Sequence, residues 1–129
     1  MTDIVQALAA LDAEPNLSDG LAAALVLVAQ KATEAAQRGP EDAAAARKAL
    51  DDGVRRTRER GDYEQAIALI DAILAADLAV GPARAELLLE KGRIFESDLL
   101  SDTRAREAFQ AALGVAEAVG DAAQDQRDQ

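Results

Sequence analysis

The amino-acid sequence predicts an all-α protein made of three stacked antiparallel helical hairpins. About a quarter of its 129 residues are Ala, the residue with the highest helix propensity. Aromatic residues make up 2% of the chain and β-branched residues are scarce, whereas β-sheets are enriched in both. Apolar residues also recur at steps of three and four, in segments that Gly, Pro and Asp separate. These three observations together favour helices throughout.

Breaks in the sequence divide the chain into segments of helical character. At residues 39–40 and 81–82, a Gly that can end one helix precedes a Pro that can begin the next. A third break lies at Gly61, and Asp62 and Gln65 after it have the spacing of a capping box. The predicted helices are residues 3–13, 19–38, 41–60, 62–79, 82–98 and 102–119.

The first three helices are predicted mainly from their boundaries. The first precedes a segment rich in Pro, Asn, Ser and Gly, after which Ser18 or Asp19 is suited to cap the second helix. The second contains the apolar run Leu21–Ala29, which at about nine residues is too short to span a bilayer and indicates a buried helix. The third begins with two acidic residues that complement the helix dipole, and its large apolar residues are Leu50 and Val54.

The last three helices each have a regular apolar face, with the spacing typical of helices that bury one side. The sixth is expected to begin at residues 101–102 and to end at Gly120, leaving residues 121–129 as a polar tail that frays. The apolar positions are Tyr63, Ala66, Ile67, Ile70, Ile73, Leu74 and Leu78 in the fourth helix, Ala85, Leu88, Gly92, Phe95 and Leu99 in the fifth, and Ala105, Ala108, Phe109, Ala112, Leu113, Ala116 and Val119 in the sixth.

The helices repeat with a period of about forty residues, a range typical of helical repeat proteins. When the chain is shifted by 39 residues, Gly53 aligns with Gly92 and Ala66 aligns with Ala105. We therefore predict a single domain, residues 1–120, that contains three hairpins. The predicted hairpins are residues 1–39, 40–81 and 82–120.

The segment Gly61–Ile67, with the sequence Gly-Asp-Tyr-Glu-Gln-Ala-Ile, resembles the tetratricopeptide repeat at the turn into its second helix. In that family a small residue of the first helix packs against a small residue of the second. A large apolar residue and another small or apolar residue then follow at steps of one turn. The matching residues are Gly53, Ala66, Ile70 and Ile73 in one hairpin, and Gly92, Ala105, Phe109 and Ala112 in the next. The match covers about residues 43–118 and implies an α-solenoid, although the period exceeds the 34 residues usual in the family.

The charge of the chain and its missing residue types exclude several classes of function. The chain has 14 basic and 24 acidic residues, a formal net charge of -10, and no Cys or His. It therefore lacks the ligands of a zinc finger, a thiol or imidazole nucleophile and any disulfide, and its charge disfavours nucleic-acid binding. The acidic pairs 51–52 and 86/90 lie beside Lys and Arg at helical spacing, which predicts ordinary ion pairs. We expect no catalytic residue, no metal, no cofactor and no enzyme activity.

Residues 55–60 form a basic segment, in which four of the six residues are Arg. As a functional site, this segment would contact an anion or a nucleic acid. As a structural feature, it would place cations in the last turns of a helix, where the helix dipole stabilises them. We favour the second interpretation, because no aromatic residue is interleaved and the rest of the chain is strongly acidic.

The tetratricopeptide resemblance implies a protein-interaction module, whose first helices line a concave groove for a peptide or a partner helix. Alignment on Gly53 and Gly92 predicts that an apolar centre with charged flanks faces this groove. The predicted partner-binding residues are Arg47, Leu50, Val54 and Arg58 in one hairpin, and Glu86, Leu89, Arg93 and Glu96 in the next. For Leu50 and Val54 the alternative is a place in the core.

The alternative function is that of a self-assembling helical protein, in which an exposed hairpin face is buried against a second copy. In either case the partner is a protein or peptide, and neither nucleic acid nor a membrane is expected. Because no Lys or Arg precedes Lys31, the basic start of a secretory signal is absent, and we expect a cytoplasmic location.

Overall fold

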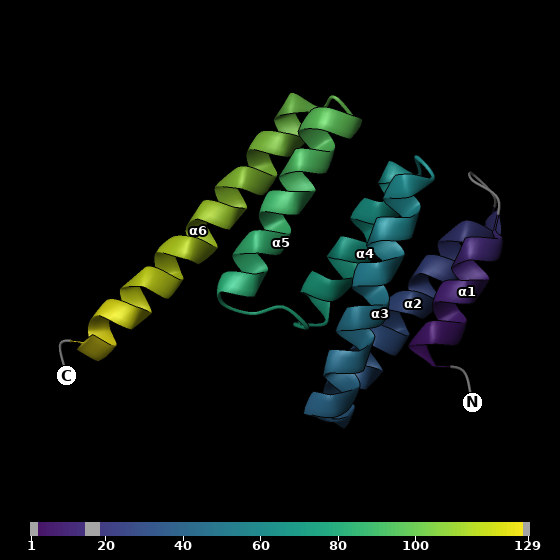
Figure 1. Ribbon diagram of the computed structural model, residues 1–129, viewed down its shortest axis with the longest axis horizontal. Helices are drawn as coiled ribbons and strands as arrows, with labels where there is room; N and C mark the ends of the chain where they lie inside the picture. Colours follow the sequence, from purple (N-terminus) through teal and green to yellow (C-terminus); the bar gives the residue numbers. More distant parts are fainter. Residues whose placement is uncertain (1–2, 15–18, 128–129) are drawn as a thin grey trace. The chain divides into compact units, whose positions relative to one another are not determined.

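The computed structural model describes residues 3–14 and 19–127, and its ribbon is drawn in Figure 1. Within these residues the protein has six α-helices, one π-helical segment and no strand. The prediction of an all-α fold is confirmed. The chain divides into two compact units, Met1–Leu78 and Ala79–Gln129, and each has its own helices.

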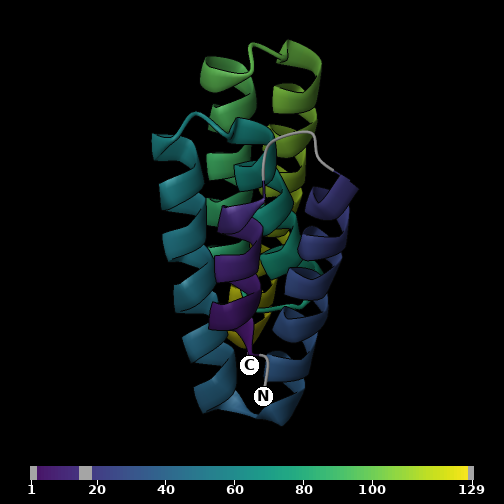
Figure 2. The ribbon, with the colours of Figure 1, turned by 90° about the vertical axis from the view of Figure 1, so that its right-hand side faces the viewer.

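The first unit consists of four helices. They are α1 (Ile4–Ala13), α2 (Asp19–Arg38), α3 (Pro40–Glu59) and α4 (Tyr63–Ala75). Helix α2 contacts the other three, and α3 contacts both α1 and α4, so that the long helices run side by side (Figure 2). Ser18, one of the two residues expected to cap α2, lies outside the described residues.

Small residues let the helices of the first unit approach closely. Gly53 of α3 is the clearest case, because a Cβ atom built there would lie 3.2 Å from Leu69 Cδ1 and 3.4 Å from Leu8 Cδ2. Ala66 of α4 is also fully buried, at 0% exposure. The large side chains buried most completely in this unit are those of Leu11, Val28, Leu50, Leu69, Ile70 and Ile73. Positions 53 and 66 are thus both buried, but the residues nearest to Gly53 are Leu69 and Leu8, whereas the tetratricopeptide resemblance implies Ala66 at this contact.

The end of α3 follows the prediction, but the predicted capping box at the start of α4 does not form. Gly61 has a left-handed φ of 81°, and the N–H of Asp62 donates to the carbonyl of Thr57 at 2.8 Å. This bond uses the donor that Gln65 would have accepted from in a capping box. The carboxylate of Asp62 makes no cap hydrogen bond and instead accepts from Arg60 Nε at 3.1 Å.

Helix α4 ends at Ala75, four residues before the predicted boundary at residue 79. Asp77 adopts a left-handed φ of 54°, and the N–H of Leu78 donates back to the carbonyl of Ile73 at 3.1 Å. This is the hydrogen bond of a Schellman ending, which usually has Gly at the left-handed position. The prediction was wrong here because Asp, unlike Gly, does not mark a helix end unambiguously in a sequence.

The second unit is one helical hairpin. Its elements are α5 (Pro82–Arg93), the π-helical segment η1 (Ile94–Asp98) and α6 (Asp102–Arg127). Helix α6 packs antiparallel against α5 and η1 (Figure 1). The predicted helix 82–98 is thus present, but its last five residues are wound more widely, and the N–H of Leu99 donates to the carbonyl of Ile94 at 3.0 Å.

Helix α6 continues through Gly120 to Arg127, which corrects the predicted end of the sixth helix. Positive φ values are found at Gly39, Gly61 and Gly81, whereas Gly120 keeps a helical backbone. No Pro follows Gly120, and the Ala and Gln residues after it favour continuation of the helix. The last two residues of the predicted polar tail, 128–129, lie outside the described residues.

Candidate protein-binding surface

The eight residues predicted to bind a partner are divided between the two units. Four lie on α3 of the first unit, and four lie on α5 and η1 of the second. In the first unit, Leu50 is 0% exposed and Val54 is 3% exposed. These two side chains belong to the core and offer no surface to a partner in this structure. The physical reason is that α3 has no other large apolar residues with which to pack against its neighbours.

The charged residues predicted on α3 remain at the surface to different degrees. Arg47 is half-buried, and its Nε donates to both carboxylate oxygens of Asp51 at 3.0 Å. Arg58 is also half-buried. Arg47 and Asp51 lie at the edge of an open pocket of about 480 Å³, together with Lys48 and Asp77. Arg47 thus forms the ion pair that its helical spacing predicts.

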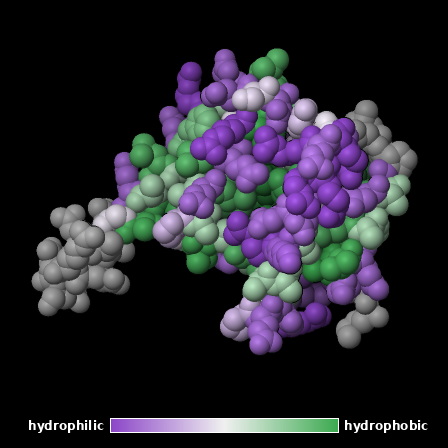
Figure 3. Space-filling view, in the orientation of Figure 1, coloured by the Kyte–Doolittle hydropathy of each residue, from purple (hydrophilic) through white to green (hydrophobic). Residues whose placement is uncertain are grey.

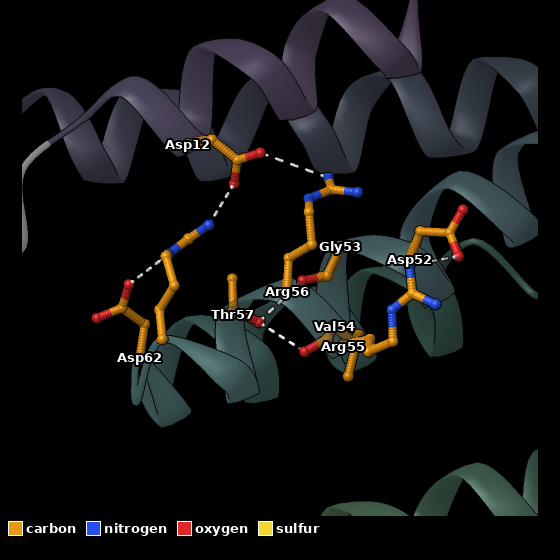
Figure 4. Close-up of polar contacts among 9 residues, drawn as sticks. Asp12, Asp52, Gly53, Val54, Arg55, Arg56, Thr57 and Asp62 are labelled. Atoms are coloured by element: carbon orange, nitrogen blue, oxygen red, sulfur yellow. Dashed lines mark hydrogen bonds and ion pairs between the residues drawn. The ribbon is translucent and has the colours of Figure 1, made fainter.

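The basic segment 55–60 is engaged by acidic residues of its own unit (Figure 4). Arg56 and Arg60 lie on either side of Asp12 of α1, with nitrogen–oxygen distances of 3.4 Å and 3.3 Å. Arg60 also pairs with Asp62 at 3.1 Å. These contacts join the end of α3 to α1. They were missed from sequence because Asp12 and Arg60 are 48 residues apart.

Two further features of this segment fit a structural role. Thr57 is completely buried, and its hydroxyl donates to the carbonyls of Gly53 and Val54 at 3.0 Å and 2.9 Å. The hydrogen bond to Asp62 is the main cause that raises the pKa of the Arg60 guanidinium, and the nearby carboxylate of Asp12 adds to it. Both carboxylates thus favour the charged form of this guanidinium.

In the second unit, the predicted positions are more accessible. Glu86, Arg93 and Glu96 are exposed, and Leu89 is half-buried. Arg93 forms no hydrogen bond or ion pair with any residue that the structure describes. The guanidinium of Arg93, which is planar and has five N–H donors, is therefore available to an acceptor on another molecule.

An open pocket of about 420 Å³ lies beside Glu96, between η1 and α6. Its lining residues are Glu96, Asp102, Ala105, Arg106, Phe109, Gln110 and Leu113. Phe109 and Leu113 supply large apolar groups, and Leu113 is 59% exposed. The charged side chains of Glu96, Asp102 and Arg106 line the same pocket. On the face of the molecule in Figure 3, hydrophobic residues lie at the surface among hydrophilic ones.

Of these lining residues, Glu96 alone was among the predicted partner-binding positions. The α6 residues were missed because the repeat resemblance directs attention to the first helix of each hairpin. A signal was present in the sequence, namely an acid and a base four residues apart, Asp102 and Arg106, followed by Phe109 and Leu113 on the same side of the helix.

Phe95 is the other aromatic residue of this unit, and it is buried beneath two cations. The guanidinium carbon of Arg104 lies 4.5 Å from the centre of its ring, and Lys91 Nζ lies 6.0 Å from it. At these distances both cations are attracted to the face of the ring. Arg104 therefore helps to hold the start of α6 against η1.

Among the side chains that the structure describes, those of residues 3–14 and 20–120, no group of three or more acidic residues is arranged to hold a metal ion. Among these same residues, no helix combines the length and the apolar character that crossing a bilayer requires. No protein-family model, curated protein or solved structure matches the chain.

Proposed function

We propose that this protein is a non-catalytic interaction module that binds a segment of a protein partner on its helical surface. The observation that carries the proposal is the open pocket beside η1 and α6. Its apolar surface of Phe109 and Leu113 is bordered by charged side chains, the arrangement of a protein-binding patch with an apolar centre and a polar rim. Its volume of about 420 Å³ leaves room for side chains of a partner.

Charges near the pocket support specific orientation of the partner. Arg93 lies one helical turn before Glu96, is exposed, and has no ion pair in the described part of the chain. A partner carboxylate that met Arg93 would gain a forked, charge-assisted hydrogen bond. The resemblance of residues 43–118 to tetratricopeptide repeats also supports the proposal, because it implies a protein-interaction module. We propose a cytoplasmic location as well, on the sequence pattern alone.

The test is a quantitative capture of proteins from the native cell by the purified chain, followed by mass spectrometry. Arg93→Glu and Leu113→Asp are expected to reduce capture of the partner at least about tenfold, as loss of an interface charge or apolar anchor does. Lys48→Glu is the matched control, because Lys48 is also exposed and has no ion pair among the described residues. Equal capture by all four proteins would contradict the proposal.

A further inference from the structure

The pocket face of α6 has a charge pattern that is complementary to itself. Asp102 and Arg106 both line the pocket, are exposed, and lie four residues apart, which is about 6 Å along the helix. Neither makes an ion pair with a residue in the described ranges of the chain. If the same face of a second molecule lies against them in the antiparallel direction, each carboxylate meets the guanidinium of the other copy. Two equivalent ion pairs then form about one twofold axis.

Leu100 provides a second observation. It lies in the turn between η1 and α6, is 80% exposed, and has a left-handed φ of 52°. A left-handed conformation disfavours Leu and favours Gly, so this position carries a large apolar side chain at a conformational cost and without burial in this molecule. Local packing does not account for Leu100, whereas a role as an apolar contact does.

The two observations fit one arrangement. A twofold axis midway between Asp102 and Arg106 passes near residue 104. A position at a given distance before residue 104 in one copy therefore lies level with the position at the same distance after it in the other copy. Phe109 lies about 7.5 Å along α6 on one side of this axis, and on the other side the helix begins at Asp102, about 3 Å away, directly after the turn that contains Leu100. In an antiparallel pair, the turn with Leu100 of the second copy therefore lies on the same side of the axis as Phe109 and the apolar part of the pocket.

We infer that the pocket between η1 and α6 is occupied by a second copy of this chain, which forms an antiparallel twofold dimer through Asp102, Arg106 and Leu100. This inference rests on the proposed function, because it names the partner of the same surface. Charge complementarity selects a second copy, because the face carries both an anion, Asp102, and a cation, Arg106, and neither has an ion-pair partner in the described ranges.

Sedimentation velocity of the full chain tests the inference, over a concentration range up to about 0.5 mM, which detects even weak association. Wild-type protein is expected to sediment as a dimer. Asp102→Arg and Arg106→Asp each place like charges opposite one another and are expected to raise the dimer dissociation constant at least about tenfold. An equimolar mixture of these two variants is expected to dimerise, because the two arginines of one variant then face the two aspartates of the other. Recovery on mixing rules out a folding defect in either variant.

Two further variants complete the test. Leu100→Asn introduces a residue that tolerates the left-handed conformation but lacks the large apolar side chain. It is expected to weaken the dimer, while circular dichroism shows unchanged helix content. Glu107→Arg is the control, since Glu107 is exposed on α6 outside the pocket lining and its reversal should leave the dimer intact. A wild-type chain that stays monomeric, or a mixture that does not dimerise, overturns the inference. If such a monomer still captures a different protein through Arg93 and Leu113, the proposed function stands without it.

Discussion

The ring of Phe109 lies directly on the backbone of Gly92, so that α6 and α5 meet where one of them has no side chain. A Cβ atom built at position 92 would lie 2.6 Å from Phe109 Cδ1, a distance that packed atoms do not adopt. Gly in a helix interior costs stability relative to Ala, and here the contact with the ring explains its presence. The same ring borders the pocket, so this contact also shapes the candidate binding surface.

Replacing Gly92 by Ala is therefore expected to lower the free energy of unfolding by about 1–3 kcal/mol, the usual cost of overpacking. Gly114→Ala is the matched control, because Gly114 also lies in a helix and nothing lies within 4 Å of a Cβ built there. That control should stabilise the protein by about 0.5–1 kcal/mol through helix propensity. Urea denaturation measures both, and equal stabilisation by the two substitutions would refute the close contact.

Ala66→Leu and Ala105→Leu are each expected to destabilise the fold by about 1–3 kcal/mol. Both side chains are buried, at 0% and 3% exposure, so the added carbon atoms have no room. Ala111→Leu, at an exposed position of α6, should leave stability within about 0.5 kcal/mol. Thermal melts that do not distinguish the two buried positions from Ala111 would remove the argument for tight helix packing.

Asp12→Asn is expected to reduce stability by about 0.5–1 kcal/mol, because it removes the anion that both Arg56 and Arg60 approach. Both guanidinium groups are partly exposed, so the loss stays within the range of surface ion pairs, and it should shrink in about 1 M salt. Asp52→Asn, which removes the 3.6 Å pair with Arg55 on the same helix, should have a smaller effect. Indistinguishable urea midpoints for the wild type and Asp12→Asn would contradict the proposed link between α1 and α3.

The pH dependence of that link follows from the raised pKa of Arg60. A cation whose pKa is higher in the folded state contributes fully below its unfolded pKa, and the contribution is lost as the pH rises through the folded value. For an arginine, this window lies beyond the range in which most proteins stay folded. Titration of Arg60 should therefore leave the stability difference between the wild type and Asp12→Asn unchanged from about pH 7 to about pH 10. A difference that falls steadily across this range would show that the pairing is not with Arg60.

Divalent ions and chelators are expected to leave the melting temperature unchanged. The acidic residues that neighbour one another are carried on helices with adjacent cations, as in the pairs of Asp51 with Arg47 and of Asp52 with Arg55. Calcium instead requires six to eight oxygen ligands, usually converging from a loop. An upward shift of the melt with millimolar Ca²⁺ or Mg²⁺ would reveal a site that the described residues do not form.

Local chemistry allowed much of the fold to be predicted from the sequence. Gly39-Pro40 and Gly81-Pro82 mark helix boundaries through their own backbone preferences, and α3 and α5 begin at these two prolines. Such boundary signals depend on residues within about four positions of one another, which a sequence displays directly. The resemblance to tetratricopeptide repeats also predicted close packing at Gly92, but against Ala105, whereas the ring of Phe109 lies nearest to it in the structure.

The tertiary structure alone decided which candidate residues lie in the core and which charged residues pair between helices. Leu50 and Val54 were candidates for both a groove and the core, and packing of α3 against α1, α2 and α4 placed its apolar face inside. The role of Arg60 depends on Asp12, which is distant in sequence and has no periodic relation to it. The pocket likewise requires η1 and α6 to be folded together. Contacts of this kind arise from the geometry of packed helices, and helical periodicity within one segment carries no information about them.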